Sequence, residues 1–308
     1  MNGGAPNEQQ LIVWHISDGR RGHDNQCLGL VQALQQLRPC RYFKISHRRS
    51  PALVLPFLLR RFPAGNDLPD PDIIIGAGHH THLSLLCAKR ARGGRTIVLM
   101  RPSIPASWFD LCLIPDHDRQ PASANVILTK GALTRIRPTN RHDPHRGLIL
   151  IGGPSRHHSW NEADLLRQID KLVERGGLHW LVSDSPRTPD NTRQALAALT
   201  GANVKYVSYR DQGGAWLAGQ LGRAGVVWIT EDSVSMIYDA LTSGAAVGLL
   251  QAPHKHESRV TRIAETLAGE KMVTLFRDWE GGKPVSVPTG TLDEAARCAG
   301  LVLQGLSL

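Results

Sequence analysis

The chain has 308 residues, 41% hydrophobic and 20% charged, a globular composition that excludes disordered, collagenous and coiled-coil proteins. Its 36 lysines and arginines against 27 aspartates and glutamates give a net charge of +9. This excess favours anionic partners such as phosphates, nucleotides, nucleic acid or an acidic membrane surface, without choosing among them. Five dispersed cysteines with no C-x-x-C pair indicate neither a disulfide framework nor a structural zinc site.

Short apolar runs alternate with amphipathic segments almost from end to end. The first series predicts strands at 11–16, 73–75, 96–100, 111–114 and 126–128, and helices at 25–37 and 82–92. A polar, proline-containing stretch at 135–146 is the expected linker. The second series predicts strands at 148–151, 180–183, 204–207, 226–230 and 247–250, and helices at 162–175, 190–199, 215–221, 235–241 and 293–306.

Strands that alternate with helices imply right-handed crossovers and parallel sheets. The sequence therefore predicts an α/β protein of two Rossmann-like, doubly wound domains that face each other across a cleft, of the GT-B type. We expect an N-terminal domain at 1–145 and a C-terminal domain at 146–308, with the last helix a candidate to pack back on the first domain. No basic segment followed by an apolar run begins the chain, and no apolar stretch reaches 18 residues, so we expect a cytoplasmic protein.

Three strand-to-helix loops carry the candidate ligand-binding residues, because ligands of open α/β sheets gather at the carboxyl ends of strands. The first loop follows the first strand, and its two glycines let the backbone approach a ligand. His23 is the acid–base group of this loop at neutral pH, and we predict it to be the catalytic base; capping a helix is its alternative role. The candidate substrate-binding residues here are Asp18, Gly19, Gly22, Asn25 and Gln26.

The second and third loops suit a nucleoside diphosphate. Gly153, Ser155 and Arg156 offer backbone amides, a hydroxyl and a guanidinium to a phosphate, although a plain tight turn is an equal interpretation. The third loop joins a strand to a helix, where carboxylates would accept a ribose diol and serines would donate to phosphate; helix capping explains the same residues. Its candidates are Glu231, Asp232, Ser233, Ser235, Met236 and Asp239.

A further segment, 52–62, places an apolar stretch between pairs of arginines. We predict contact with an anionic membrane, against the alternative of a core helix with charged ends. The predicted contact residues are Leu55, Phe57, Leu58, Arg60, Arg61 and Phe62. His79 and His82 stand three residues apart, a spacing that could suit a metal on a helix. No acidic residue or cysteine is adjacent to them, so we predict no metal site. No nucleic-acid recognition motif is present, so we expect no nucleic-acid partner.

Several of these motifs together resemble the mitochondrial fission protein family, known from the plant "elongated mitochondria" protein and its bacterial relatives. The matching segments are DGRRGHDNQ at 18–26 with Gly29 and Leu30, and those at 75–78, 109–111, 115–118, 125–126, 129–132, 152–155 and 230–236. That family is similar to GT-B glycosyltransferases, above all to the family that adds N-acetylglucosamine to a lipid-linked peptidoglycan precursor. Its first loop also ends in Gly-His, like Gly22-His23, and its ribose-binding glutamate stands five residues before a glycine, where this chain has Asp239 and Gly244.

The resemblance implies an inverting, metal-independent glycosyltransferase that needs no cofactor. It would move a sugar from a nucleotide-diphosphate sugar to a membrane-surface or lipid-linked acceptor, with peripheral contact at the inner face of the membrane. Two other functions fit the same residues: a non-catalytic, transferase-like scaffold at a membrane, and a nucleotide-sugar epimerase.

Overall fold

The computed structural model describes residues 10–46, 57–118, 121, 123–175, 177–199, 201, 203–258, 260–287 and 290–306. The chain forms two compact units: unit 1 comprises Met1–Arg135 with Asp293–Leu308, and unit 2 comprises Ile136–Leu292. The units change at Arg135/Ile136, ten residues before the boundary expected from the sequence, and the last helix belongs to unit 1.

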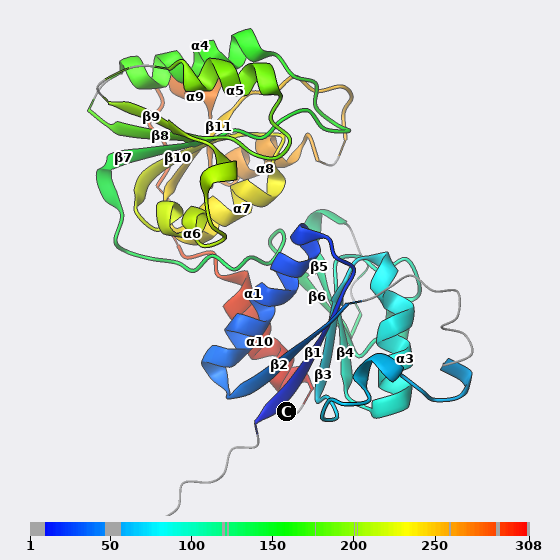
Figure 1. Cartoon of the computed structure of the whole chain (residues 1–308). Coiled ribbons are helices and arrows are strands. Elements are labelled where there is room, and N and C mark those ends of the chain that lie inside the picture. Colours follow the sequence, from blue (N-terminus) through cyan, green and yellow to red (C-terminus); the bar gives the residue numbers. More distant parts are fainter. Residues whose placement is uncertain are drawn as a thin grey trace, which may run out of the picture. The chain divides into compact units, whose positions relative to one another are not determined.

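Unit 1 is built on a parallel six-stranded sheet in the order β2-β1-β3-β4-β5-β6. Its strands are β1 (Leu11–Ser17), β2 (Cys40–Ser46), β3 (Ile73–Ala77), β4 (Arg95–Leu99), β5 (Leu111–Pro115) and β6 (Val126–Thr129). Helices α1 (Arg21–Leu37) and α10 (Glu294–Gly305) cover one face, and α3 (His82–Arg92) covers the other (Figure 1).

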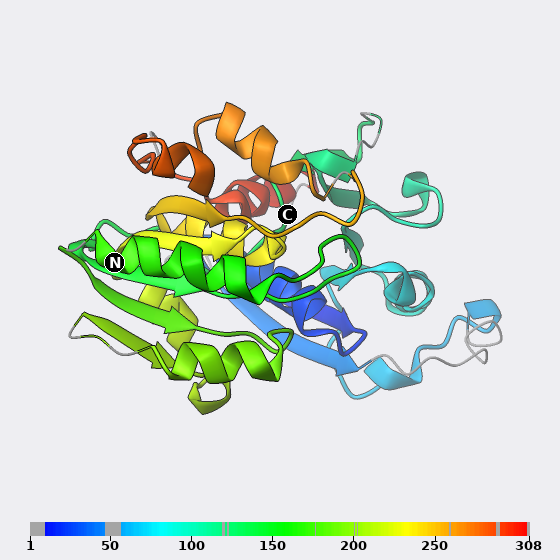
Figure 2. The ribbon, with the colours of Figure 1, turned by 90° about the horizontal axis from the view of Figure 1, so that it is seen from above.

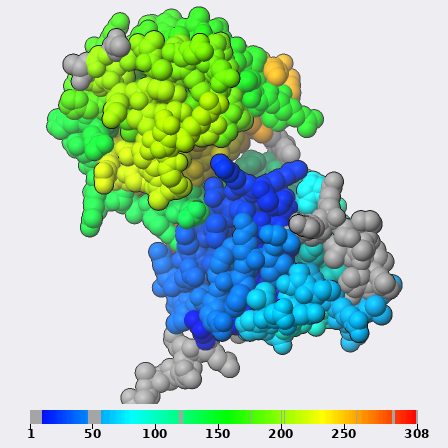
Figure 3. Space-filling view, viewed as in Figure 1, coloured from blue at the N-terminus to red at the C-terminus, as the bar shows by residue number. Residues whose placement is uncertain are grey.

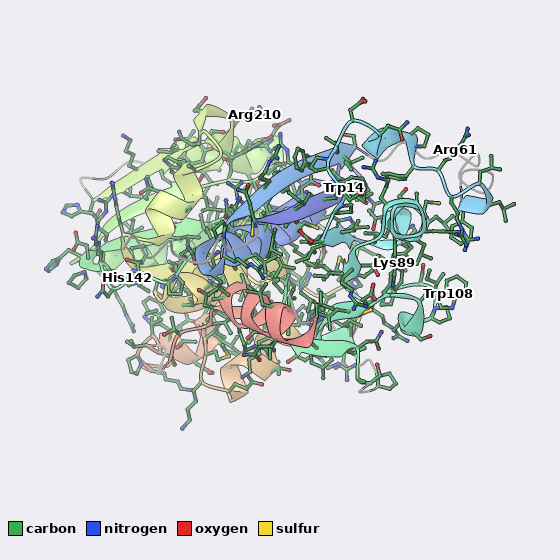
Figure 4. The ribbon with its side chains drawn as sticks, turned by 90° about the horizontal axis from the view of Figure 1, so that it is seen from below. Trp14, Arg61, Lys89, Trp108, His142 and Arg210 are labelled. Carbon is green, nitrogen blue, oxygen red and sulfur yellow. The ribbon has the colours of Figure 1, made fainter. Side chains whose placement is uncertain are left out.

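Burial on both faces explains the continuous apolar strands of unit 1. Leu11 and Val13 of β1 pack with α1 and α10, whereas Trp14 and Ile16, which point to the opposite face, pack with α3. Trp14 is accordingly enclosed within the unit, while Trp108 lies at its periphery (Figure 4). In the space-filling view, residues of α1 and β2 (blue) form much of the visible face of unit 1 (Figure 3).

Unit 2 has a second parallel six-stranded sheet, in the order β12-β11-β10-β7-β8-β9. Its strands are β7 (Asp143–Leu150), β8 (His179–Ser183), β9 (Val204–Val207), β10 (Ala224–Thr230), β11 (Ala246–Leu250) and β12 (Thr274–Leu275). Helices α4 (Glu162–Glu174), α5 (Asp190–Ala197) and α9 (Phe276–Glu280) cover one face; α6 (Trp216–Leu221), α7 (Val234–Ser243) and α8 (Ile263–Gly269) cover the other (Figures 1 and 2).

The strand orders locate the ligand-binding edge of each unit. In unit 1 the chain reverses direction across the sheet between β1 and β3, and in unit 2 between β7 and β10. At such a reversal, neighbouring strand-to-helix loops diverge above the carboxyl ends of the strands and leave room for a ligand. The loops after β1 and β3, and those after β7 and β10, are therefore the places to look for a site.

The predicted α/β class with two parallel sheets is confirmed, and most elements lie within a few residues of their expected bounds. The sequence did not predict β2, α8, β12 and α9. Two expected bounds were also wrong. The helix α1 begins at Arg21 rather than at residue 25, and β7 begins at Asp143, inside the stretch taken as linker. The first half of β7 is exposed and polar, so it lacks the apolar pattern that marks its second half.

Candidate functional site

His23 and Asp18 form the central contact of the loop after β1. The Nδ1 atom of His23 lies 2.9 Å from Oδ2 of Asp18, whose side chain is only 3% exposed, whereas that of His23 is 16% exposed. A carboxylate only accepts hydrogen bonds, so neutral His23 carries its proton on Nδ1 and leaves the Nε2 lone pair available. This pairing orients an imidazole to remove a proton from a substrate.

Gly78, the residue after β3, forms the surface on which the His23 ring rests. Its φ is +77°, and a Cβ placed there would lie 2.4 Å from Cε1 of His23. A side chain at this position would therefore collide with the ring. The absence of a side chain at Gly78 is a specific requirement of this site, which the sequence alone did not indicate.

A hydrogen-bond network braces the first turn of α1 beside this pair. Asp24 accepts hydrogen bonds from Ser17 Oγ (2.6 Å) and Lys44 Nζ (2.8 Å), and its Oδ1 lies 3.4 Å from Nε2 of His15. Although burial opposes ionisation, these two hydrogen bonds lower the pKa of Asp24. Burial lowers the pKa of His15 to about 4, so His15 is neutral and Nδ1 pairs with Tyr42 Oη at 2.9 Å.

The remaining candidates of this loop surround the same helix start. Gly19 has a φ of +80° and precedes α1. Gly22 lies in the first turn, where no atom stands within 4 Å of the place that a Cβ would occupy. Asn25 is exposed and Gln26 is half-buried. The structure thus brings Asp18, His23 and Gly78 together, and leaves Asn25 and Gln26 in the second turn of the helix.

In unit 2, the loop after β7 is a tightly packed Gly152–Gly153 turn. The Gly152 N–H donates to Thr230 Oγ1 (2.8 Å), and the Gly153 N–H donates to Asp232 Oδ2 (3.1 Å). A Cβ on Gly153 would lie 2.1 Å from the Arg187 carbonyl oxygen. Ser155 Oγ accepts from the backbone N–H groups of His157 and His158, and Arg156 is exposed. Through these hydrogen bonds the turn links the loop after β7 to the loop after β10, the two loops at the strand reversal of unit 2.

Arg187, in the loop after β8, is the residue that sequence reasoning missed. Its Nη2 lies 2.7 Å from Oδ2 of Asp232, and its Nη1 donates to the Gly153 carbonyl at 2.9 Å. The Asp232 side chain is fully buried, whereas that of Arg187 is 39% exposed. Asp232 was predicted to touch the substrate, and in the structure its buried carboxylate forms an ion pair with the partly exposed Arg187.

Two histidines and an acid complete this cluster. Nε2 of His254 lies 3.4 Å from Oε1 of Glu231, which also accepts the Ala252 N–H at 2.8 Å. Burial raises the pKa of Glu231 and lowers that of fully buried His158 to about 4. Within the described residues, Nε2 of His158 and Oδ1 of Asp232 are buried and have no hydrogen-bond partner.

The start of α7 contributes the other predicted residues of the third loop. Ser233 is its N-cap residue, but its side chain accepts no capping hydrogen bond. Ser235 is exposed and Asp239, one turn later, is half-buried, so both lie on one helix face. Met236 packs against the hydrophobic core of the unit. The first N–H groups of α7 point toward the loop edge, as in any helix N-terminus, and favour an anion there.

The segment predicted to contact a membrane divides into two parts. Phe57, Leu58, Arg60 and Arg61 are exposed, and Leu55 lies outside the described residues. Phe62 was a wrong prediction: it is 6% exposed and stacks on Trp14 with ring centroids 6.0 Å apart. A side chain in the core of the unit does not reach a bilayer. Figure 4 places Arg61 at the periphery of unit 1.

Neither a membrane-spanning helix nor a metal-binding cluster occurs in the part of the chain that the structure describes. No helix there is both long and apolar enough to cross a bilayer. No three histidine, cysteine, aspartate or glutamate residues of that part converge as metal ligands would.

The mitochondrial fission ELM1 family matches residues 21–306, nearly the whole chain. The chain belongs to this family. It is also 24% identical over 330 aligned positions to an uncharacterized protein of Rickettsia prowazekii (strain Madrid E), covering 87% of this chain and 91% of the relative.

Solved structures with the same fold include UDP-GlcNAc 2-epimerases and a glycosyltransferase. The UDP-GlcNAc 2-epimerase of Methanocaldococcus jannaschii superposes with a TM-score of 0.60 at 10% identity, covering 96% of this chain and all of that one. The putative UDP-N-acetylglucosamine 2-epimerase of Listeria monocytogenes gives 0.58 at 12% identity, covering 97% and 96%. CalG4, the calicheamicin glycosyltransferase, gives 0.54 at 12% identity, covering 97% and 99%. This ELM1-family chain therefore has the GT-B fold, which glycosyltransferases and UDP-GlcNAc epimerases share.

Proposed function

We propose that this protein is a glycosyltransferase that moves a sugar from a nucleoside-diphosphate sugar to a hydroxyl group of a membrane-associated acceptor. The observation that carries the proposal is the His23–Asp18 pair: a partly exposed imidazole, oriented by a buried carboxylate, at the strand reversal of unit 1. A binding scaffold has no need of an oriented base, so this pair favours an enzyme over the scaffold.

In the proposed reaction, Nε2 of His23 removes the proton of the acceptor hydroxyl. The acceptor oxygen attacks the anomeric carbon, and the bond from that carbon to the diphosphate oxygen breaks with inversion of configuration. The nucleoside diphosphate leaves with the bonding electron pair. Asp18 stabilises the imidazolium that forms on His23, as a buried carboxylate does beside any catalytic histidine.

Unit 2 would bind the donor. The leaving diphosphate gains negative charge, which Arg187, Arg156 and the N–H groups at the start of α7 would stabilise. Asp239 is the candidate to accept hydrogen bonds from the ribose hydroxyls. Ser155 and Ser235 are the candidates to donate hydrogen bonds to the phosphates. Arg187 is the strongest of these candidates because Asp232 and the Gly153 carbonyl already hold its guanidinium in place.

The proposal that the acceptor is membrane-associated is supported by the exposed residues 57–61 of unit 1. Phe57 and Leu58 are exposed beside Arg60 and Arg61, and apolar side chains flanked by arginines suit the interface of an anionic bilayer. Sedimentation with phosphatidylglycerol vesicles tests this contact. We expect Leu58→Ser to weaken it and Leu37→Ser, at another exposed leucine of unit 1, to leave it unchanged.

Titration calorimetry with uridine, guanosine and cytidine diphosphates tests the donor, and mass spectrometry of the products tests the reaction. We expect one nucleotide to bind and its sugar to appear on a lipid-extract acceptor. His23→Ala should lower the rate about 10²–10⁴-fold, whereas His145→Ala, at an exposed histidine near the amino end of β7, should keep it. Failure of every nucleotide to bind at millimolar concentration would favour the scaffold. An isomeric nucleotide sugar formed without an acceptor would favour the epimerase.

A further inference from the structure

A cavity lies in unit 2, at the opposite edge of the sheet from the proposed donor loops. Its volume is about 360 Å³, and it is lined at the amino ends of β7, β8, β9 and β10 and by the end of α6. The polar side chains around it are Asp143, Arg146, His179, Lys205 and Gln220. The nucleotide edge of the same sheet is formed by the residues that follow the carboxyl ends of these strands, so the two sites are separate.

The strand register gathers three basic side chains on one face of the sheet. Arg146 pairs directly with His179, and Lys205 pairs with Leu181, two residues beyond His179. Because side chains alternate between faces, Arg146, His179, Leu181 and Lys205 all point to the face that α6 and α7 cover. Three adjacent strands thus bring their basic groups to one cavity.

The two positive charges of this cavity are only partly balanced by the one carboxylate in its lining. Among the described residues, neither Arg146 nor Lys205 makes an ion pair, and Asp143, the carboxylate of the lining, accepts the His145 N–H at 2.9 Å. Arg146 on β7 and Lys205 on β9 lie on the two strands that flank β8, and two positive charges on one face of the sheet repel each other. A bound anion between Arg146 and Lys205 would remove that repulsion.

We propose that this cavity binds a soluble, hydroxylated phosphate monoester of the sugar-phosphate type. The Arg146 guanidinium is suited to bidentate contact with a phosphate, and the Lys205 ammonium supplies a second positive charge. Asp143 would accept a hydroxyl of the ligand, so a phosphate that carries hydroxyls fits better than a bare phosphate. The volume lies in the lower range of small-molecule sites, about 300–1,000 Å³.

Calorimetric titration of the full chain with glycerol 3-phosphate, glucose 6-phosphate and inorganic phosphate tests this site. We expect both esters to bind more tightly than inorganic phosphate. Arg146→Gln and Lys205→Gln should each weaken binding about tenfold, the scale of one charge-assisted contact, and the double variant should show no binding. Lys283→Gln, which removes the same charge from an exposed lysine away from the cavity, should bind like the wild type. Undiminished binding by the double variant would overturn the proposal.

Three further measurements separate this site from other sources of phosphate binding. Saturating uridine diphosphate should leave the ester affinity unchanged; displacement of the ester would place it in the donor site and overturn the proposal. Binding to phosphatidic acid vesicles without binding of soluble esters would assign the charges to a lipid surface and also overturn it. The melting temperature of the double variant without ligand should equal or exceed that of the wild type, and only the wild type should gain stability with ester.

Discussion

Replacing Gly78 by alanine tests whether the backbone after β3 positions the catalytic imidazole. Two effects are expected. At a φ of +77° and a ψ of 159°, a residue other than glycine costs about 1–3 kcal/mol of backbone strain. In addition, the new Cβ would stand 2.4 Å from Cε1 of His23, far inside van der Waals contact, so the ring must move, which disturbs its hydrogen bond to Asp18.

Gly93→Ala is the matched control because it isolates the strain from the collision. Gly93 has the same φ of +77°, with a ψ of −153°, but nothing lies within 4 Å of its Cβ position. Both variants should lose about 1–3 kcal/mol of unfolding free energy, which corresponds to about 2–4 °C in melting temperature per kcal/mol for a chain of this size.

The two variants should differ only at His23. Nitrogen-correlated NMR of the imidazole reports its tautomer, and Gly93→Ala should retain the wild-type signal of an Nδ1 proton bonded to Asp18. In Gly78→Ala we expect that signal to shift and the transfer rate to fall about 10–100-fold, since misplacement of a catalytic group by about 1 Å costs about that much. A Gly78→Ala protein with the wild-type His23 spectrum and rate would refute the reasoning.

Three other predictions concern unit 2. The pKa of buried His158, about 4, lies below its unfolded value, so the unfolded chain binds more protons between about pH 6.5 and 4. Urea unfolding should therefore show stability present at pH 7.5 and falling by about 2 kcal/mol at pH 5 from this group, a loss that His158→Gln removes; equal pH slopes for both proteins would contradict it. Asp232→Ala should weaken nucleotide binding about as much as Arg187→Ala, because the substitution removes the carboxylate that holds the Arg187 guanidinium in place. An unchanged affinity would exclude this positioning role of Asp232. Gly147→Ala should destabilise the protein by about 1–3 kcal/mol in chemical unfolding, because its Cβ would overlap the Trp180 ring at 2.2 Å. Gly213→Ala, also in unit 2, has no such neighbour and no positive φ, so equal losses would argue against the overlap.

The sequence determined the elements and their order, because burial on both faces of a parallel sheet leaves a signal in the chain itself. The run Ile73–Ile75 and the helix His82–Arg92 are examples, and both lie where the pattern predicted them. The strand β2 was missed because it lies at the edge of its sheet, where every residue except Ile45 is half-buried or exposed and the apolar pattern weakens.

The sequence indicated part of the candidate site, and the tertiary structure decided the rest. The residues DGRRGHD predicted a base at His23, because a strand, a glycine turn and a helix place that loop at a ligand-binding edge. Only the tertiary structure decided its partners. The hydrogen bond of His23 to Asp18, its contact with Gly78 at the end of a neighbouring strand, and the ion pair of Arg187 with Asp232 all depend on how the folded chain places these residues. Local sequence patterns report burial and turn geometry, whereas long-range contacts depend on which strands become neighbours, and no local pattern records that.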